Sequence, residues 1–169
     1  MSTDRQKSFV GTLSCEGAPV CTERVFSAGR GGYKLLVINP DKDPTRFYFR
    51  YEHEAYILYV RGRPGVIQLV NLNPHGELAI SPPSDAHETR FDIGGMSLED
   101  MHSDSITSSI AVKGQRPLTL DIKYGGGRYA NGEREKKIYF KSENNKPTAR
   151  FTVNIIERNA GHVEYPDEV

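Results

Sequence analysis

Short hydrophobic runs, several of them alternating with polar residues, follow one another along the first half of the chain. The runs lie at 33–38, 47–52, 55–60 and 66–70. An unbroken apolar run of this length is typical of a buried strand, and alternation with a period of two is typical of a half-buried strand. The polar pair His53-Glu54 separates the second run from the third and has the length of a tight hairpin turn. The pattern predicts an antiparallel meander.

Two other segments have apolar spacings that suit a helix. Within residues 5–14, the residues Phe9, Val10 and Leu13 stand at i, i+1 and i+4, which predicts a short amphipathic helix. Between residues 96 and 112 the apolar positions fit helical turns in part, but Ser and Thr are frequent there. The pattern of this second segment therefore leaves its structure open.

The second half of the chain again favours strands. Residues 118–122 alternate, residues 138–140 are apolar at every second position, and the turn-forming pair Asn131-Gly132 lies between them. Residues 151–155 form a last alternating run. We therefore predict an α+β, β-rich fold with a mostly antiparallel sheet and few short helices, and an all-β sandwich is the alternative. Residues 1–169 are expected to form a single domain, with a frayed acidic tail at 160–169.

Length and charge say little about the class of protein, but they bear on the charge of its surface. A chain of 169 residues suits one domain that buries a sizeable core. Lys and Arg number 22, and Asp and Glu number 22, so the net charge is zero, which excludes a uniformly basic nucleic-acid-binding chain. Residues 113–158 nevertheless hold an excess of Lys and Arg. One interpretation is a local surface that faces an anion or RNA, and the other is an ordinary solvated hairpin.

Location and metal content follow from what the residue pattern lacks. The start of the chain has no apolar segment of a secretory signal, and no stretch has the length of a membrane span. We therefore expect a cytoplasmic protein without a membrane partner. Cys15 and Cys21 are two reduced thiols or a short-loop disulfide. Because the histidines and cysteines lack metal-ligand spacing, no cofactor is expected.

One segment suggests an alternative metal site. Residues 103–108 resemble the acidic-x-x-Ser/Thr-Ser calcium segment of βγ-crystallins, although the family's second copy of that motif is absent. The resemblance implies oxygen ligands from Asp104 and Ser108, which would suit a hard cation. A Ser-rich turn is the other interpretation of the same residues.

A second resemblance covers residues 8 to about 112. Segments at 8–13, 33–38, 47–62 and 91–100 follow one another in an order and rough spacing that resemble the N-terminal half of ribosome-inactivating proteins. That toxin family removes an adenine from large-subunit rRNA by glycosidic cleavage. The resemblance implies a role in defence, translation inhibition, and the ribosome or its rRNA as partner.

The family's chemistry can be carried over at only two positions. Tyr56 matches the first tyrosine that stacks on the adenine, and Arg150 matches the arginine that assists the departing base. Ser97 stands where the family has its second stacking tyrosine, and Pro147 stands where it has its catalytic glutamate. We therefore expect weakened or lost rRNA N-glycosidase activity.

A function of another class remains open beside the toxin-like one. The same strands suit a non-enzymatic β-rich binding module that is calcium-binding or lectin-like, with a protein or carbohydrate partner.

Overall fold

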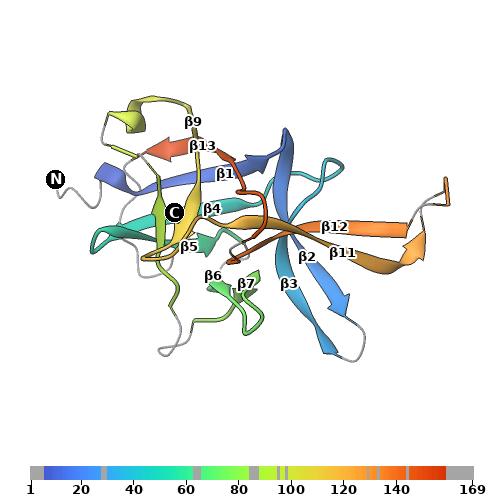
Figure 1. Cartoon of the computed structure of the whole chain (residues 1–169). Coiled ribbons are helices and arrows are strands. Elements are labelled where there is room, and N and C mark those ends of the chain that lie inside the picture. The colour runs from blue at the N-terminus through green and yellow to red at the C-terminus, as the bar shows by residue number, and fades with distance from the viewer. Residues whose placement is uncertain are drawn as a thin grey trace.

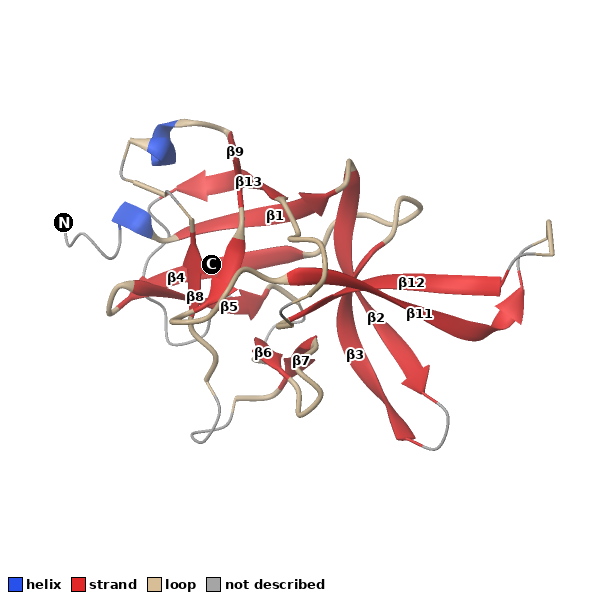
Figure 2. Cartoon of the chain, viewed as in Figure 1, coloured by secondary structure: helices blue, strands red, loops and turns tan. Residues whose placement is uncertain are grey.

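A computed structural model of the chain describes residues 6–27, 30–62, 66–83, 88–94, 96–97, 99–128, 130–132, 134–143 and 145–158. Within these ranges the protein consists of strands β1 to β13 and one 3-10 turn, η1 (Asp100–His102). A helical turn at Gln6-Lys7 precedes β1, and no other α-helical segment occurs in the described ranges. Strands therefore dominate the fold (Figure 2). The predicted acidic tail at 160–169 lies outside the described residues.

The strands follow one another with short connections. Their bounds are Phe9–Cys15 (β1), Ala18–Ser27 (β2), Arg30–Ile38 (β3), Arg46–Glu52 (β4), Ala55–Val60 (β5), Leu69–Leu72 (β6), Leu78–Ser81 (β7), Phe91–Ile93 (β8), Ser105–Ser108 (β9), Ile110–Val112 (β10), Thr119–Arg128 (β11), Arg134–Lys141 (β12) and Phe151–Arg158 (β13).

Seven strands pair in a closed circuit and form an antiparallel barrel (Figure 1). The circuit runs from β1 through β4, β5, β6, β7, β3 and β2 back to β1. The other strands extend it: β13 and β9 continue from β1, β8 and β10 continue from β5, and β12 and β11 continue from β3. The prediction of a β-rich, mostly antiparallel fold is confirmed, and the fold is essentially all β.

Each barrel strand contributes side chains to one main core. Aromatic rings fill its centre, where the rings of Phe9 and Phe49 stack with centroids 4.4 Å apart. Two smaller clusters form on the opposite faces of the same strands. The main core contains, from the barrel strands, Phe9, Leu13, Cys15, Val20, Leu36, Phe47, Phe49, Tyr56, Leu58, Val60, Val70 and Leu78.

The segment predicted as an N-terminal helix is strand β1, and its burial explains the error. Phe9 and Leu13 pack in the main core, whereas Val10 packs in the second cluster on the other face. A strand that is buried on both faces does not alternate between apolar and polar residues, so the expected signal is missing. The ambiguous segment at 96–112 likewise forms η1, β9 and β10 rather than an α-helix.

Two long hairpins extend beyond the barrel and diverge from each other (Figure 1). One consists of β2 and β3, and the other consists of β11 and β12. They pair directly only where Ile138 and Tyr139 meet Ile38 and Val37.

Candidate anion-binding site

The two residues carried over from the ribosome-inactivating family lie far apart. The Tyr56 ring is 4 % exposed within the aromatic core, and its hydroxyl donates a hydrogen bond to the Lys7 carbonyl oxygen at 3.2 Å. Arg150 is exposed and directly precedes β13, beside the Cys15 end of β1, whereas Tyr56 packs against Phe9 at the opposite end. The length of β1 separates the two ends by about 20 Å. The geometry therefore gives the N-glycosidase site no support.

The residues of the alternative calcium site are also separated. Asp104 accepts a hydrogen bond from Arg158, 2.8 Å away, and Ser108 donates to the Gly94 carbonyl oxygen. Asp104 directly precedes β9 and Ser108 is its last residue, so about 13 Å of extended chain lies between them. No group of three or more His, Cys, Asp or Glu side chains suited to a metal occurs among the described residues.

The two cysteines are buried free thiols on different faces of the sheet. Cys15 packs in the main core, and Cys21 packs in the third cluster. Burial raises the pKa of Cys15 to about 11 and also raises the pKa of Cys21. The structure therefore favours the reduced-thiol interpretation over the short-loop disulfide.

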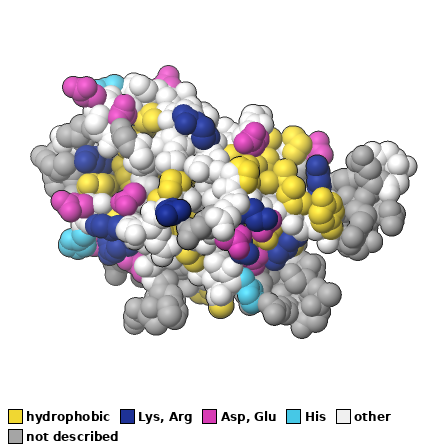
Figure 3. Space-filling view, viewed as in Figure 1, with side chains coloured by type: hydrophobic (Ala, Val, Ile, Leu, Met, Phe, Trp, Pro, Cys, Tyr) yellow, Lys and Arg dark blue, Asp and Glu magenta, His cyan; other side chains and the backbone are white. Residues whose placement is uncertain are grey.

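Several lysines of the basic segment 113–158 are already neutralised by buried glutamates. Lys137 of β12 lies 2.6 Å from Glu23 of β2, and Lys123 of β11 forms an ion pair with Glu77 at the start of β7. Both glutamate side chains are almost fully buried. On the face shown in Figure 3, acidic and basic side chains are interspersed. Lys137 thus links the two hairpins, and Lys123 links the hairpin of β11 and β12 to β7, so these two lysines are not part of an open basic surface.

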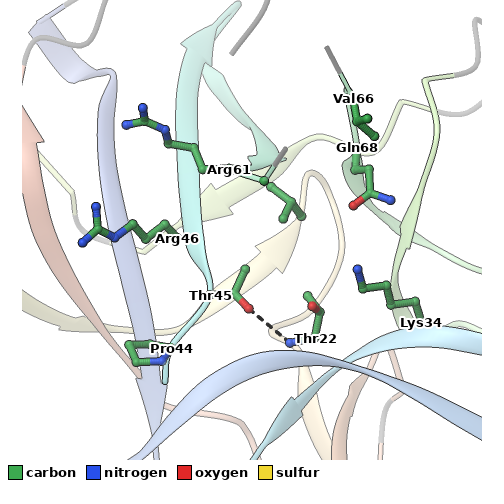
Figure 4. A pocket seen from close by; sticks show the side chains of 10 residues that line it. Thr22, Lys34, Pro44, Thr45, Arg46, Arg61, Val66 and Gln68 are labelled. Atoms are coloured by element: carbon green, nitrogen blue, oxygen red, sulfur yellow. Dashed lines mark hydrogen bonds between the residues drawn. The ribbon is translucent and has the colours of Figure 1, made fainter. Parts of the chain in front are cut away.

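A cavity of about 670 Å³ opens where β4 begins and β5 ends (Figure 4). Val60, which belongs to the main core, contributes to its wall. Thr22 is two residues from the core residue Val20 in β2, and Lys34 is two residues from the core residue Leu36 in β3. Because side chains alternate along a strand, Thr22 and Lys34 lie on the same face of the sheet as these core residues. The full lining is Thr22, Lys34, Pro44, Thr45, Arg46, Val60, Arg61, Gly62, Val66 and Gln68.

Hydrogen bonds between backbone groups hold the cavity wall in place. The Arg61 amide donates to the Arg46 carbonyl oxygen at 2.9 Å, and the Val60 amide donates to the Gln68 carbonyl oxygen at 2.9 Å. The Thr22 amide donates to the Thr45 hydroxyl oxygen at 3.2 Å. The side chains around the opening are therefore carried by elements that are fixed to one another.

The cavity is lined by three cations and, among its described residues, by no acid. Lys34, Arg46 and Arg61 form no ion pair or side-chain hydrogen bond with any described residue. This differs from Lys123 and Lys137, each of which has a carboxylate partner. Arg46 and Arg61 are also neighbours across adjacent strands, an arrangement of like charges that is unfavourable without a counterion. In Figure 4 the side chains of Arg46 and Arg61 extend away from Lys34 and Gln68, so Lys34 is the cation that faces the cavity and the two arginines lie at its border. The cavity and its border thus carry positive charge without an acid among the described lining residues.

Glu23 fixes the loop that forms one side of the cavity. Its carboxylate accepts hydrogen bonds from Asn39 at 2.6 Å and from Lys42 at 2.9 Å, both in the loop that leads to Pro44 and Thr45. Burial raises the pKa of Glu23, but the hydrogen bonds from Lys137, Lys42 and Asn39 outweigh burial and lower the pKa to about 2. The carboxylate is therefore ionised at all ordinary pH values.

The polar side chains that line the cavity carry hydroxyl, amide and basic groups. Among the described residues that line the cavity, there is no carboxylate, histidine or cysteine to serve as a base or nucleophile. The sequence pattern did not single out Lys34, Arg46 or Arg61 as residues of a site. The signal that existed was basic residues at the ends of the predicted strands, where barrels often bind ligands.

Comparisons of the chain with protein-family models, with curated proteins and with solved structures found no match. Among the described residues, none of the helical segments has the length and apolar character needed to cross a membrane.

Proposed function

We propose that the protein is a non-enzymatic β-barrel binding module whose ligand carries phosphate, sulfate or a comparable anionic group. The observation that supports this proposal best is Lys34, which faces the cavity without a carboxylate partner among the described residues, with the positive charges of Arg46 and Arg61 at the border of the cavity. Arginine and lysine donate charge-assisted hydrogen bonds to such groups, and arginine does so with two parallel donors.

The placement of the cavity agrees with this function. A volume of about 670 Å³ falls within the range of small-molecule sites, about 300–1,000 Å³. The wall is formed by barrel strands and by loops hydrogen-bonded to them, so the site is formed before the ligand arrives. A preformed site loses little conformational entropy when a ligand binds.

Isothermal titration with inorganic pyrophosphate at low ionic strength tests the proposal. We expect Lys34→Gln to weaken binding by about threefold to tenfold, because it removes one charge-assisted contact. Arg116→Gln is the matched control: Arg116 is exposed, lies outside this cavity and has no ion pair with a described residue. An affinity that Arg116→Gln lowers as much as Lys34→Gln would show that net charge, not the cavity, binds the anion.

The adenine-removing activity implied by the family resemblance stays a prediction, and so does an rRNA partner. It has a separate test: ribosomes are incubated with the protein and the rRNA is then treated with aniline. Release of the fragment diagnostic of a lost adenine, abolished by Arg150→Gln, would support the enzyme. An intact rRNA after treatment with excess protein would contradict it.

A further inference from the structure

We infer that the ligand of this cavity is an organic monoester of phosphate or sulfate, in which one anionic group is joined to a body that is partly apolar. This inference rests on the proposed function and goes further, because it specifies the number of anionic groups and requires an organic part.

The cavity is the mouth of the barrel, where polar side chains lie on the face of the sheet that the main core covers. Gln68 continues the pairing of β6 with β5 and stands opposite Val60, a residue of the main core. Side chains directly opposite each other share a face of the sheet, so Gln68 lies on the core face. Thr45 lies on the same face, because it comes two residues before the core residue Phe47. Thr22 and Lys34, placed on this face above, complete the polar set.

One cation of the lining lies on this face, which implies one anionic group. Arg46 directly precedes Phe47 and Arg61 directly follows Val60, so alternation along the strands places both arginines on the opposite face. The partly buried Lys34 is therefore the cation that meets the ligand. Arg24, its exposed cross-strand neighbour, is not part of the lining.

The other polar groups of the mouth supply neutral donors for the same anionic group and its ester oxygen. The Thr45 hydroxyl oxygen accepts a hydrogen bond from the Thr22 amide at 3.2 Å, so its proton remains available to donate. The Gln68 side chain has no hydrogen-bond partner among the described residues, and its amide points into the same part of the cavity as the Lys34 ammonium (Figure 4). An ester oxygen that accepts from Lys34 can therefore be joined by a second that accepts from Gln68.

The rest of the lining requires more than a bare anion. A cavity of about 670 Å³ far exceeds the size of an inorganic phosphate ion. Val60 and Pro44 contribute apolar wall, and Val66 is 48 % exposed on the same side of the cavity as Gln68 (Figure 4). Covering this apolar surface with a hydrocarbon group removes it from water, which favours binding in proportion to the area covered.

The closing experiment is an isothermal titration series at one low ionic strength. The probes are inorganic phosphate, phenyl phosphate, phenyl sulfate and inorganic pyrophosphate. We expect phenyl phosphate or phenyl sulfate to bind about tenfold more tightly than inorganic phosphate, because the ring covers apolar wall. Whichever phenyl ester binds more tightly identifies the ester group. Pyrophosphate, which has a second anionic group and no organic body, is expected to bind no more tightly than that phenyl ester.

Two kinds of variant separate the anionic group from the organic body. Lys34→Gln is expected to weaken the binding of inorganic phosphate and of the phenyl ester alike, by about threefold to tenfold. Val66→Ser is expected to weaken the phenyl ester by about threefold and to leave inorganic phosphate unchanged. Ile156→Ser is the matched control, because Ile156 is also 48 % exposed but lies outside the cavity, and it is expected to change neither affinity.

The outcomes separate this inference from the proposed function. Equal affinity for inorganic phosphate and both phenyl esters overturns the organic body and leaves the anion site standing, and so does a Val66→Ser effect no larger than that of Ile156→Ser. Pyrophosphate that binds several times more tightly than either phenyl ester overturns the single anionic group. Absence of binding for every anion overturns both proposals.

Discussion

The carboxylate of Glu23 connects β2, the loop before β4 and the hairpin of β11 and β12. Glu23→Gln replaces this carboxylate with a neutral amide. The glutamine keeps the size of the side chain and one hydrogen-bond acceptor, but it no longer attracts Lys42 and Lys137. Two lysines are then left beside a neutral group, and Lys137 is only partly exposed.

The magnitude follows from the lowered pKa of Glu23. The pKa falls from 4.5 to about 2 on folding. One pKa unit corresponds to about 1.4 kcal/mol, so the ionised carboxylate stabilises the folded state by about 3 kcal/mol. Because the Lys42 side chain is 54 % exposed, its attraction is screened by solvent. We therefore expect Glu23→Gln to lower the free energy of unfolding by about 2 kcal/mol near neutral pH.

The pH dependence distinguishes this account from a simple packing defect. A carboxylate whose pKa is lowered on folding stabilises the protein fully above its unfolded pKa of 4.5, and the stabilisation is lost as pH falls through about 2. The difference in stability between the wild type and Glu23→Gln is therefore expected to shrink between these two pH values.

Urea unfolding of both proteins across this pH range measures the difference. Glu157→Gln is the matched control, because Glu157 is an exposed strand residue without an ion pair to a described residue, and it is expected to change stability by less than about 0.5 kcal/mol. A difference between Glu23→Gln and the wild type that stays constant from neutral pH to pH 2 would refute the reasoning.

Two further predictions concern packing. Gly11→Ala is expected to destabilise the protein by about 2 kcal/mol or more in urea unfolding, because the added Cβ would lie 2.6 Å from the backbone oxygen of Asn154. At Gly62 an added Cβ meets open space, so the control variant Gly62→Ala is expected to be nearly neutral. Equal effects of the two substitutions would contradict the account. Cys15 and Cys21 are expected to react with a thiol reagent only after unfolding, because both are buried free thiols. Fast modification of the native protein would contradict that burial.

The strands that could be predicted are those with a local signal. The hairpin at 47–52 and 55–60 forms β4 and β5 as expected, and residues 53 and 54 adopt the left-handed backbone of a tight turn. The runs at 33–38 and 151–155 lie within β3 and β13, and Asn131-Gly132 lies between β11 and β12. Alternation and turn residues are properties of short stretches of sequence, so they can be recognised without tertiary information.

The errors arose where burial depends on distant parts of the chain. β1 pairs with β13, which is far away in sequence. Side chains of distant strands pack against β1 and bury both of its faces. Nothing local distinguishes such a strand from a buried helix. β2 was not predicted, because Glu23 stands among its apolar residues; the partners that neutralise it, Lys42 and Lys137, come from other elements.

The candidate site was also beyond the reach of local patterns. Lys34 and Arg46 are ordinary charged residues in the sequence, and they become notable only when barrel closure brings them to one cavity. In contrast, the lysines of segment 113–158 looked like a basic surface, but Lys123 and Lys137 meet buried glutamates of β7 and β2. The sequence contains the charges, but only the fold decides which of them remain without a partner.

The central claim, an anion site at the cavity, is tested most directly by titrating the isotopically labelled protein with inorganic pyrophosphate and following its backbone amide signals by NMR. The account predicts that the largest shifts occur at Thr22, Lys34, Thr45 and Gln68, and that they disappear in the Lys34→Gln variant. Shifts confined to the β11–β12 hairpin, or none at millimolar ligand, would contradict it.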